Sequence, residues 1–273
     1  MGQKAAEIAG IVTNMLNLNY ASKPVGVILG TGWGDKLVIE NSKESFLDRL
    51  PGFETLGSLE GHARKYMFGR LGQQEVLALS GRIHLNEHPS DPRLPDMVRL
   101  QTEVMLQLGV KKFIVTCAAR SLPGSNLETG SIVIMDGFVT VFAPPMPLYA
   151  GEFCSPEDSL TSELLNVAVD CRRHYDGPVC TGGYAMVRGP FFEGLRYDKN
   201  VLAATGAKIV GMSTLPEACV CALYPGVQML GLAFVTNGDS EVHSHEVNIE
   251  RAKKSAEGLS NYLNHLIAAI GVL

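Results

Sequence analysis

The sequence has little charge and no surplus of positive charge. Only 19% of its 273 residues are Asp, Glu, Lys or Arg, whereas an ordinary globular domain carries about 25%. The 23 Lys and Arg are outnumbered by 28 Asp and Glu. This balance argues against nucleic acid as the main partner, because phosphate backbones are bound by clustered Lys and Arg. With 46% apolar residues, the chain also lacks the composition of a disordered protein.

Signals for secretion, membranes and metals are missing as well. Residues 1–10 hold no apolar signal-peptide core, and the uncharged stretch 218–237 is broken by Pro225-Gly226. We expect a buried helix, a turn and a core strand in that stretch, and no membrane span. No Cys-x-x-Cys occurs, and Cys219-x-Cys221 is too closely spaced for the usual zinc pair. We therefore expect a cytoplasmic protein with no metal site, no membrane partner and reduced cysteines in or near the core.

Short apolar runs typical of buried strands alternate with stretches of helical periodicity. The predicted strands are 25–29, 66–71, 75–79, 112–116, 131–135, 139–142, 183–187, 208–211 and 229–235. The predicted helices are 5–18, 97–108, 159–173, 195–205, 217–223 and 247–270. This alternation predicts one α/β domain over residues 1–273, with a mixed, mostly parallel central sheet flanked by helices. Because ligands of such sheets bind beyond the carboxyl ends of the strands, those ends are the candidate sites.

Three glycines follow the first predicted strand. Gly30, Gly32 and Gly34 surround Thr31, but Asp35 stands where the nucleotide-binding pattern Gly-x-Gly-x-x-Gly has its last glycine. No Walker lysine is present either. The segment is therefore either a simple tight turn or a turn whose backbone N–H groups and hydroxyl face an anion.

The segment after the strand 75–79 combines a cation with a histidine. Arg82 and His84 alternate, so on an extended backbone their side chains point to the same side. Arginine binds phosphate through a bidentate fork, and histidine can donate to an anionic oxygen. Glu87 could orient either side chain. The alternative is a cluster of charges on the surface.

Two further segments suit a planar ligand. The small residues at 115–119 allow a ligand to approach the backbone, and Phe192 beside Glu193 suits a planar base that carries an N–H donor. Glu217, at the end of the segment 210–217, could equally belong to the first turn of a helix, where acidic residues are favoured.

Taken in this order, the segments resemble the purine nucleoside phosphorylase family, of the trimeric type that prefers 6-oxopurines. The resemblance runs from Val25 to about His245. It rests on Leu29-Gly30-Thr31-Gly32, Gly61-His62-Ala63, Gly81-Arg82-Ile83-His84, Leu108-Gly109-Val110, Val115-Thr116, Gly189-Pro190-x-Phe192-Glu193, Val210-Gly211-Met212-Ser213-Thr214-x-Pro216-Glu217 and Thr236-Asn237. It implies that inorganic phosphate, as co-substrate, cleaves inosine or guanosine to the free purine and ribose 1-phosphate. It also implies a homotrimer and no cofactor.

The resemblance implies a role for each matched residue. Phosphate would be bound by Thr31, His62, Arg82, His84, the Ala118 backbone and Ser213. Purine and ribose would be bound by Phe192, Glu193, Met212, Asn237, Tyr184 and His245, with His243 as the alternative to His245. Catalysis would rest on Asn237, Glu193 and His84. Bond breaking leaves negative charge on the purine, which a donor such as Asn237 can stabilise.

The sequence departs from the family pattern in four places, one of which is Gly238-Asp239, where Lys-Val or a similar pair is common after Asn237. The segment Cys117–Ser121 replaces Asn-Ala-Ala-Gly-Gly, so that Arg120 stands at a usual glycine. Asn86 stands where a ribose-lining Tyr is common. The stretch 137–156 is shorter than usual, and Phe153 is only a guess for the Phe that enters a neighbouring subunit's site.

These departures keep two alternatives open. One is a related phosphorylase that prefers adenosine or methylthioadenosine. The other is a non-catalytic, nucleoside-binding homologue, since a fold alone does not establish an activity.

Overall fold

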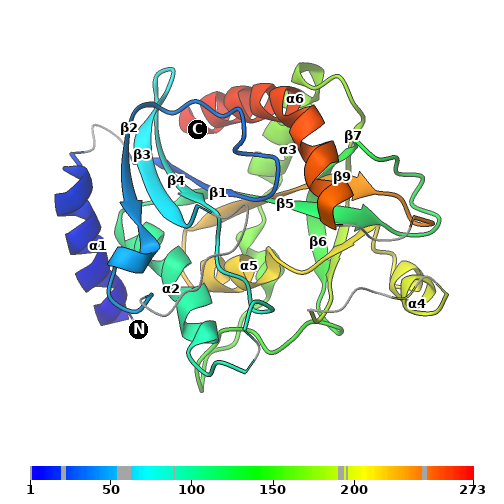
Figure 1. The fold of residues 1–273 in the computed structure, drawn as a ribbon, viewed down its shortest axis with the longest axis horizontal. Helices are drawn as coiled ribbons and strands as arrows, with labels where there is room; N and C mark the ends of the chain where they lie inside the picture. The colour runs from blue at the N-terminus through cyan, green and yellow to red at the C-terminus, as the bar shows by residue number, and fades with distance from the viewer. Residues whose placement is uncertain are drawn as a thin grey trace.

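The computed structural model describes residues 2–19, 23–53, 63–88, 90–189, 194, 196–241 and 245–273. Within them, one nine-stranded mixed sheet runs in the order β2-β3-β4-β1-β5-β8-β7-β6-β9 (Figure 1). Its strands are β1 (Val25–Leu29), β2 (Glu40–Phe46), β3 (Lys65–Leu71), β4 (Gln74–Ser80), β5 (Lys112–Ser121), β6 (Ile132–Val139), β7 (Val179–Met186), β8 (Ile209–Gly211) and β9 (Gln228–Asn237). The predicted α/β fold, with a mixed central sheet flanked by helices, is confirmed.

Strand β5 is shared by two parts of the sheet. It pairs in parallel with β1 and with β9, and its last residues, Arg120 and Ser121, pair antiparallel with β8. Since β9 pairs with β6, β6 with β7 and β7 with β8, the strands β5, β9, β6, β7 and β8 form a closed ring. On the other side of β5, the strands β1, β4, β3 and β2 continue as an open sheet.

Helices cover both faces of the sheet. α1 (Gly2–Leu16), α2 (Leu94–Gln107) and α5 (Leu215–Ala222) share one apolar cluster with side chains of β1, β4 and β5. α3 (Ser162–Asp170) and α6 (His245–Gly271) form a second cluster on the opposite face, where α6 appears in red in Figure 1. The short helix α4 (Asp198–Ala204) packs near the ring through the buried Leu202. Burial of these apolar faces is the main force that holds the layers together.

Several predicted elements differ in extent from the observed ones. Strand β5 continues five residues beyond the predicted end at Thr116, because the residues that follow are buried between two neighbouring strands. The predicted strand 139–142 is wrong, since β6 ends at Val139 and a turn follows. The predicted helix 159–173 is shorter, and 3-10 turns flank α3 at Pro156–Ser159 and Cys171–His174. The strand β2 was not predicted, because its first five residues are polar or charged and exposed.

The uncharged stretch 218–237 folds as expected. It contains most of α5, a turn at Pro225-Gly226 and the strand β9. In the part of the chain that the structure describes, no helix combines the length and apolarity needed to cross a membrane. All six cysteines are free, and four of them are buried, as predicted.

Gly30 offers a test of the contact between β1 and β5. A Cβ at residue 30 would lie 2.5 Å from the main-chain oxygen of Thr116 and 2.8 Å from Cys117 Cα. Because backbone atoms cannot move aside cheaply, we expect Gly30→Ala to lower the free energy of unfolding by about 1–3 kcal/mol in urea denaturation. The control is Gly34→Ala in the same turn, where the nearest atom is Leu29 Cδ1 at 3.2 Å, the end of a flexible side chain. Equal losses in both variants would contradict this account of the contact.

Candidate active site

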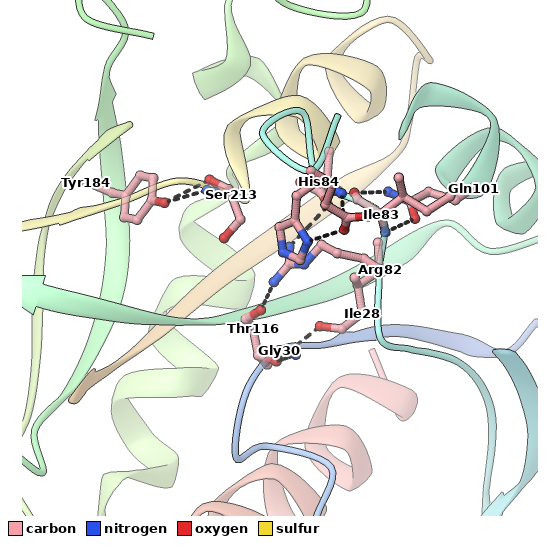
Figure 2. Close-up of polar contacts among 11 residues, drawn as sticks. Ile28, Gly30, Arg82, Ile83, His84, Gln101, Thr116, Tyr184 and Ser213 are labelled. Carbon is pink, nitrogen blue, oxygen red and sulfur yellow. Dashed lines mark hydrogen bonds and ion pairs between the residues drawn. The ribbon is translucent and has the colours of Figure 1, made fainter. Parts of the chain in front are cut away.

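The carboxyl ends of four parallel strands meet at one edge of the sheet. β4, β1, β5 and β9 run in the same direction, so the segments that follow them lie along this edge. Figure 2 shows Arg82 reaching from the segment after β4 to Thr116 of β5, with Gly30 beside them. It also shows Ser213, from the turn between β8 and α5, bound to Tyr184 of β7.

The hydroxyl of Thr116 fixes the glycine turn after β1. Its Oγ1 accepts a hydrogen bond from Gly30 N at 2.9 Å and donates to Ile28 O at 3.1 Å. Gly32 adopts a φ of +84° and packs against α6, where a Cβ would lie 2.6 Å from Ala252 Cβ. Thr31, between the two glycines, is half-buried. The turn is thus a fixed part of the site edge.

Arg82 is a buried cation held by two partners. Its side chain is 2% exposed, its Nη1 lies 3.1 Å from Glu217 Oε1, and its Nη2 donates to the main-chain oxygen of Thr116. A buried arginine needs such a counter-charge, because an unpaired charge in the interior is strongly unfavourable. Arg82 Nε is buried and has no hydrogen-bond partner among the described residues. A buried donor without a partner is uncommon and is consistent with a ligand acceptor at this place.

Glu217 has a different role from the one that its position at a helix start suggested. It does lie in the first turn of α5, but its side chain is 2% exposed and forms the ion pair with Arg82. The sequence could not pair the two residues, since 135 positions separate them.

His84 is oriented by Glu87, as the sequence suggested. His84 Nδ1 lies 3.0 Å from Glu87 Oε1, which also accepts from His84 N at 2.9 Å. Glu87 Oε2 accepts from Arg64 Nη2 at 2.6 Å. Burial raises the pKa of the Glu87 carboxyl, but the hydrogen bonds from His84 and the charges of His84 and Arg64 outweigh burial and hold this pKa below its usual range. Glu87 is therefore a carboxylate that fixes the His84 ring.

The turn that carries Ser213 is held by Tyr184. The buried Tyr184 hydroxyl donates to Ser213 O at 2.8 Å and accepts from Ser213 N at 3.1 Å. Thr214 follows with a φ of +72°, which is unusual for a β-branched residue and marks local strain. The hydroxyl of Tyr184 thus binds the backbone of Ser213. A contact between Tyr184 and a ribose stays a prediction.

Cys117 lies at the centre of this group. Its thiol is buried and lies within electrostatic reach of Arg82. Burial raises the pKa of the thiol, although the Arg82 charge lowers it. The thiol consequently stays protonated and acts as a neutral packing group. The sequence singled out Cys117 as one of the small residues at 115–119 and as a departure from the family pattern, but gave it no partner.

Gln101 is a site-supporting residue that sequence reasoning missed. It is fully buried on α2, and its amide clamps Ile83 by accepting from Ile83 N at 2.8 Å and donating to Ile83 O at 3.0 Å. Ile83 lies between Arg82 and His84, so the clamp positions both. Arg99, Thr102 and Glu103 are also polar and buried on α2, so no feature of the sequence sets Gln101 apart.

Asn86 and Met212 come together from distant segments. Asn86 Nδ2 lies 3.5 Å from Met212 Sδ, and a Cβ on Gly189 would lie 2.7 Å from Asn86 Cβ. Met212, a residue that the resemblance assigns to ribose, therefore lies beside Asn86, which stands where a ribose-lining Tyr is common. Ala118 is half-buried on β5.

At the end of β9, Asn237 is bound by Arg120. One terminal atom of the Asn237 amide lies 2.8 Å from both Nε and Nη2 of Arg120, and the other lies 3.0 Å from Thr236 Oγ1. Because guanidinium nitrogens only donate, the atom that faces Arg120 is the amide oxygen. Asn237 and Arg120 are 3% and 5% exposed.

Some predicted residues cannot be placed. His62, Phe192, Glu193 and His243 lie outside the described residues, as does the side chain of His245, whose backbone begins α6. In the described ranges, His, Cys, Asp and Glu form no group of three or more that could hold a metal ion.

The sequence model of the Phosphorylase superfamily matches residues 24–268. Purine nucleoside phosphorylase 1 of Bacillus subtilis is 28% identical over 260 residues, covering 90% of this chain and 92% of the relative. The purine nucleoside phosphorylase of Mycobacterium leprae is 27% identical over 272 residues, covering 99% of this chain and 95% of the relative. The structure of Schistosoma mansoni purine nucleoside phosphorylase in complex with adenosine superposes with a TM-score of 0.79 at 25% identity. The superposition covers 97% of this chain and 96% of the Schistosoma chain.

Glu87→Gln tests the support of His84. The carboxylate stabilises the fold above its usual pKa of 4.5, and this stabilisation is lost as the pH falls through the lowered pKa of the folded state. We expect E87Q to lower the free energy of unfolding by about 1.5–3 kcal/mol at pH 7, measured by urea denaturation. The difference in unfolding free energy between wild type and E87Q should shrink below about pH 4.

The control for this measurement is Glu44→Gln. Glu44 forms an ion pair with Lys65 at 2.6 Å, but its side chain is 36% exposed. We expect a loss below about 1 kcal/mol for this exposed pair. If the difference in unfolding free energy between wild type and E87Q stays constant from pH 7 to well below pH 4, the proposed charge interaction is refuted.

Proposed function

The chain belongs to the phosphorylase superfamily and is an enzyme of the purine nucleoside phosphorylase type, and we propose that its preferred substrates are the 6-oxopurine nucleosides inosine and guanosine. Inorganic phosphate is the co-substrate, no cofactor is needed, and the products are the free purine and ribose 1-phosphate. One observation carries the proposal: β5 contacts Arg82 near its middle, through the Thr116 carbonyl, and Asn237 at its end, through Arg120. These contacts support an anion-binding group and a base-binding group along one strand.

Phosphate is assigned to the region between Arg82 and the start of α5. Phosphate carries about −1.5 to −2 charges at pH 7, so it needs a cation and several donors. Arg82 supplies the charge, and its buried Nε has no other acceptor among the described residues. The helix α5 begins directly after Ser213, and the positive end of its dipole favours an anion. We assign the remaining contacts to Thr31, His62, His84 and the Ala118 backbone.

The purine is assigned to the end of β9. Asn237 can donate to the base through its amide, while Glu193 would accept the N1–H of a 6-oxopurine and Phe192 would stack beside the ring. The sugar then lies between base and phosphate. We assign it to Met212, Tyr184 and His245, with His243 as the alternative to His245. The position of Met212 beside Asn86 supports this assignment.

The spacing along β5 suits a nucleoside and a phosphate. Thr116, which contacts Arg82, and Arg120, which contacts Asn237, are four residues apart on the strand. At roughly 3.3 Å per residue this corresponds to about 13 Å, which leaves room for a sugar between an anion and a base.

The assigned groups match the charges of the reaction. As the bond between C1′ and N9 breaks, its electron pair moves to the purine and the sugar becomes positive. A phosphate oxygen bonds to C1′ and stabilises the positive charge on the sugar. Asn237 and Glu193 hold the purine while its negative charge develops, and a donor such as Asn237 is typically worth about 10²–10³ in rate. His84, fixed by Glu87, donates to the phosphate.

We also propose a homotrimer that acts in the cytoplasm. Phe153 is 91% exposed and Val141 is 77% exposed, both in the segment between β6 and α3, and large exposed apolar side chains favour a protein contact. Six free cysteines fit a reducing compartment. Light scattering of the purified protein tests the trimer, and a monomer would refute it.

The first test is phosphate-dependent cleavage. We expect the pure protein to release hypoxanthine from inosine, and guanine from guanosine, only when phosphate is present, as followed by chromatography. Adenosine and methylthioadenosine serve as competing substrates, and a clear preference for either would replace the proposed one. Base binding by calorimetry without any turnover would indicate a non-catalytic homologue.

Arg82→Met tests the phosphate site. We expect kcat/KM for phosphate to fall at least 100-fold, because a neutral side chain removes the buried cation that phosphate needs. Arg93→Gln is the matched control, since Arg93 forms an exposed pair with Asp91, and its activity should stay unchanged. If R82M still folds and retains near-normal activity, phosphate binds elsewhere.

A further inference from the structure

Arg120 is a buried cation directly beside the assigned purine site. It is 5% exposed and belongs to the last residue pair between β5 and β9. The register shifts between Ala119 and Arg120, so that Arg120 lies opposite Asn237 rather than Thr236. This irregularity brings the guanidinium next to the Asn237 amide. A glycine at position 120 could not make the contact.

The contact fixes which way the amide of Asn237 faces. Nε and Nη2 of Arg120 form a fork that donates twice to the amide oxygen, at 2.8 Å each. The amide nitrogen donates to Thr236 Oγ1 at 3.0 Å. An amide oxygen has two lone pairs and an amide nitrogen has two N–H groups. The oxygen is thus fully used, and one N–H is left for a ligand.

We propose that Arg120 is a positioning and specificity-determining residue, which locks Asn237 as a hydrogen-bond donor to the purine. This inference rests on the function proposed above. A locked donor suits a base that presents acceptors, N7 and a 6-oxo group, at this edge. It does not suit a 6-amino group, which needs an acceptor. The locked amide therefore favours 6-oxopurine over 6-aminopurine nucleosides.

The same contact assists the chemical step. When the C1′–N9 electron pair moves to the purine, negative charge spreads to the acceptors that face Asn237. A guanidinium on the amide oxygen polarises the amide and makes its N–H a stronger donor. Arg120 thereby acts on the leaving base through Asn237 and need not touch the substrate.

Arg120 also anchors the segment after β9, so the test must separate the two roles. Its Nη2 donates to Glu241 O at 3.2 Å. Arg251 of α6 anchors the same segment, since it donates to Thr236 O at 2.9 Å and pairs with the Glu241 carboxylate. Among the described contacts, Arg251 makes none with the Asn237 amide. Arg251→Met is therefore the matched control.

The experiment compares wild type, Arg120→Met and Arg251→Met on inosine and adenosine at saturating phosphate. We expect R120M to lower kcat on inosine at least 30-fold, with a smaller change in KM. We also expect the inosine-to-adenosine ratio of kcat/KM to fall at least tenfold, because a released amide can turn its oxygen toward a 6-amino group. If wild type shows no adenosine turnover, its appearance in R120M is the equivalent result.

Two further variants keep the test decisive. Compared with R120M, Arg120→Lys should restore part of the wild-type inosine-to-adenosine ratio of kcat/KM, because an ammonium can still donate to the amide oxygen. If R120M does not fold, as judged by circular dichroism, Arg120→Gln replaces it with a side chain that can give one hydrogen bond. An unchanged substrate ratio in the Arg120 variants, or the same change in R251M, would overturn the inference. Absence of phosphorolysis of every nucleoside by wild type would instead overturn the proposed function.

Discussion

The backbone of β5 is the constraint on which the site depends, because one strand has to satisfy hydrogen bonds with β1, β9 and β8 at once. Parallel pairing on two sides fixes its first part, and a short antiparallel pairing fixes its end. As a result, its residues cannot shift without breaking bonds on several sides. The Thr116 hydroxyl, the Thr116 carbonyl and the Arg120 guanidinium act from this rigid base on the glycine turn, on Arg82 and on Asn237. Rigid support of this kind is what a binding site needs before its ligand arrives.

Buried cations lie at both ends of this site. Arg82 is balanced by Glu217, whereas Arg120 meets the dipole of an amide and a backbone carbonyl. Under the proposed function, a cation at the base end suits a reaction in which the base leaves with the electron pair. Elsewhere in the described chain, the Arg99 side chain shows the same principle, since Glu103 and Glu152 surround it.

Local sequence patterns predicted the fold well, since apolar runs and helical periodicity report burial directly. The strand β1 was predicted to the residue, and the hairpin of β3 and β4 to within one residue at each end. The edge strand β2 escaped detection because an exposed strand needs no apolar alternation. The roles of Glu217, Gln101 and Arg120 also escaped, because each depends on a partner that only the tertiary fold brings near. The orientation of His84 by Glu87 was predictable, since the two residues are three positions apart.

The closed ring also decides where the molecule can join other strands. A strand inside a ring offers no free row of N–H and C=O groups, so in the described part of the sheet the open edge lies at β2. That strand carries Glu40, Lys43 and Glu44 as exposed charges in a chain that is otherwise poor in them. Charges on an edge strand oppose pairing with a second molecule and so protect against aggregation. The strand that sequence patterns failed to reveal is thus the one whose polarity keeps separate molecules from extending each other's sheets.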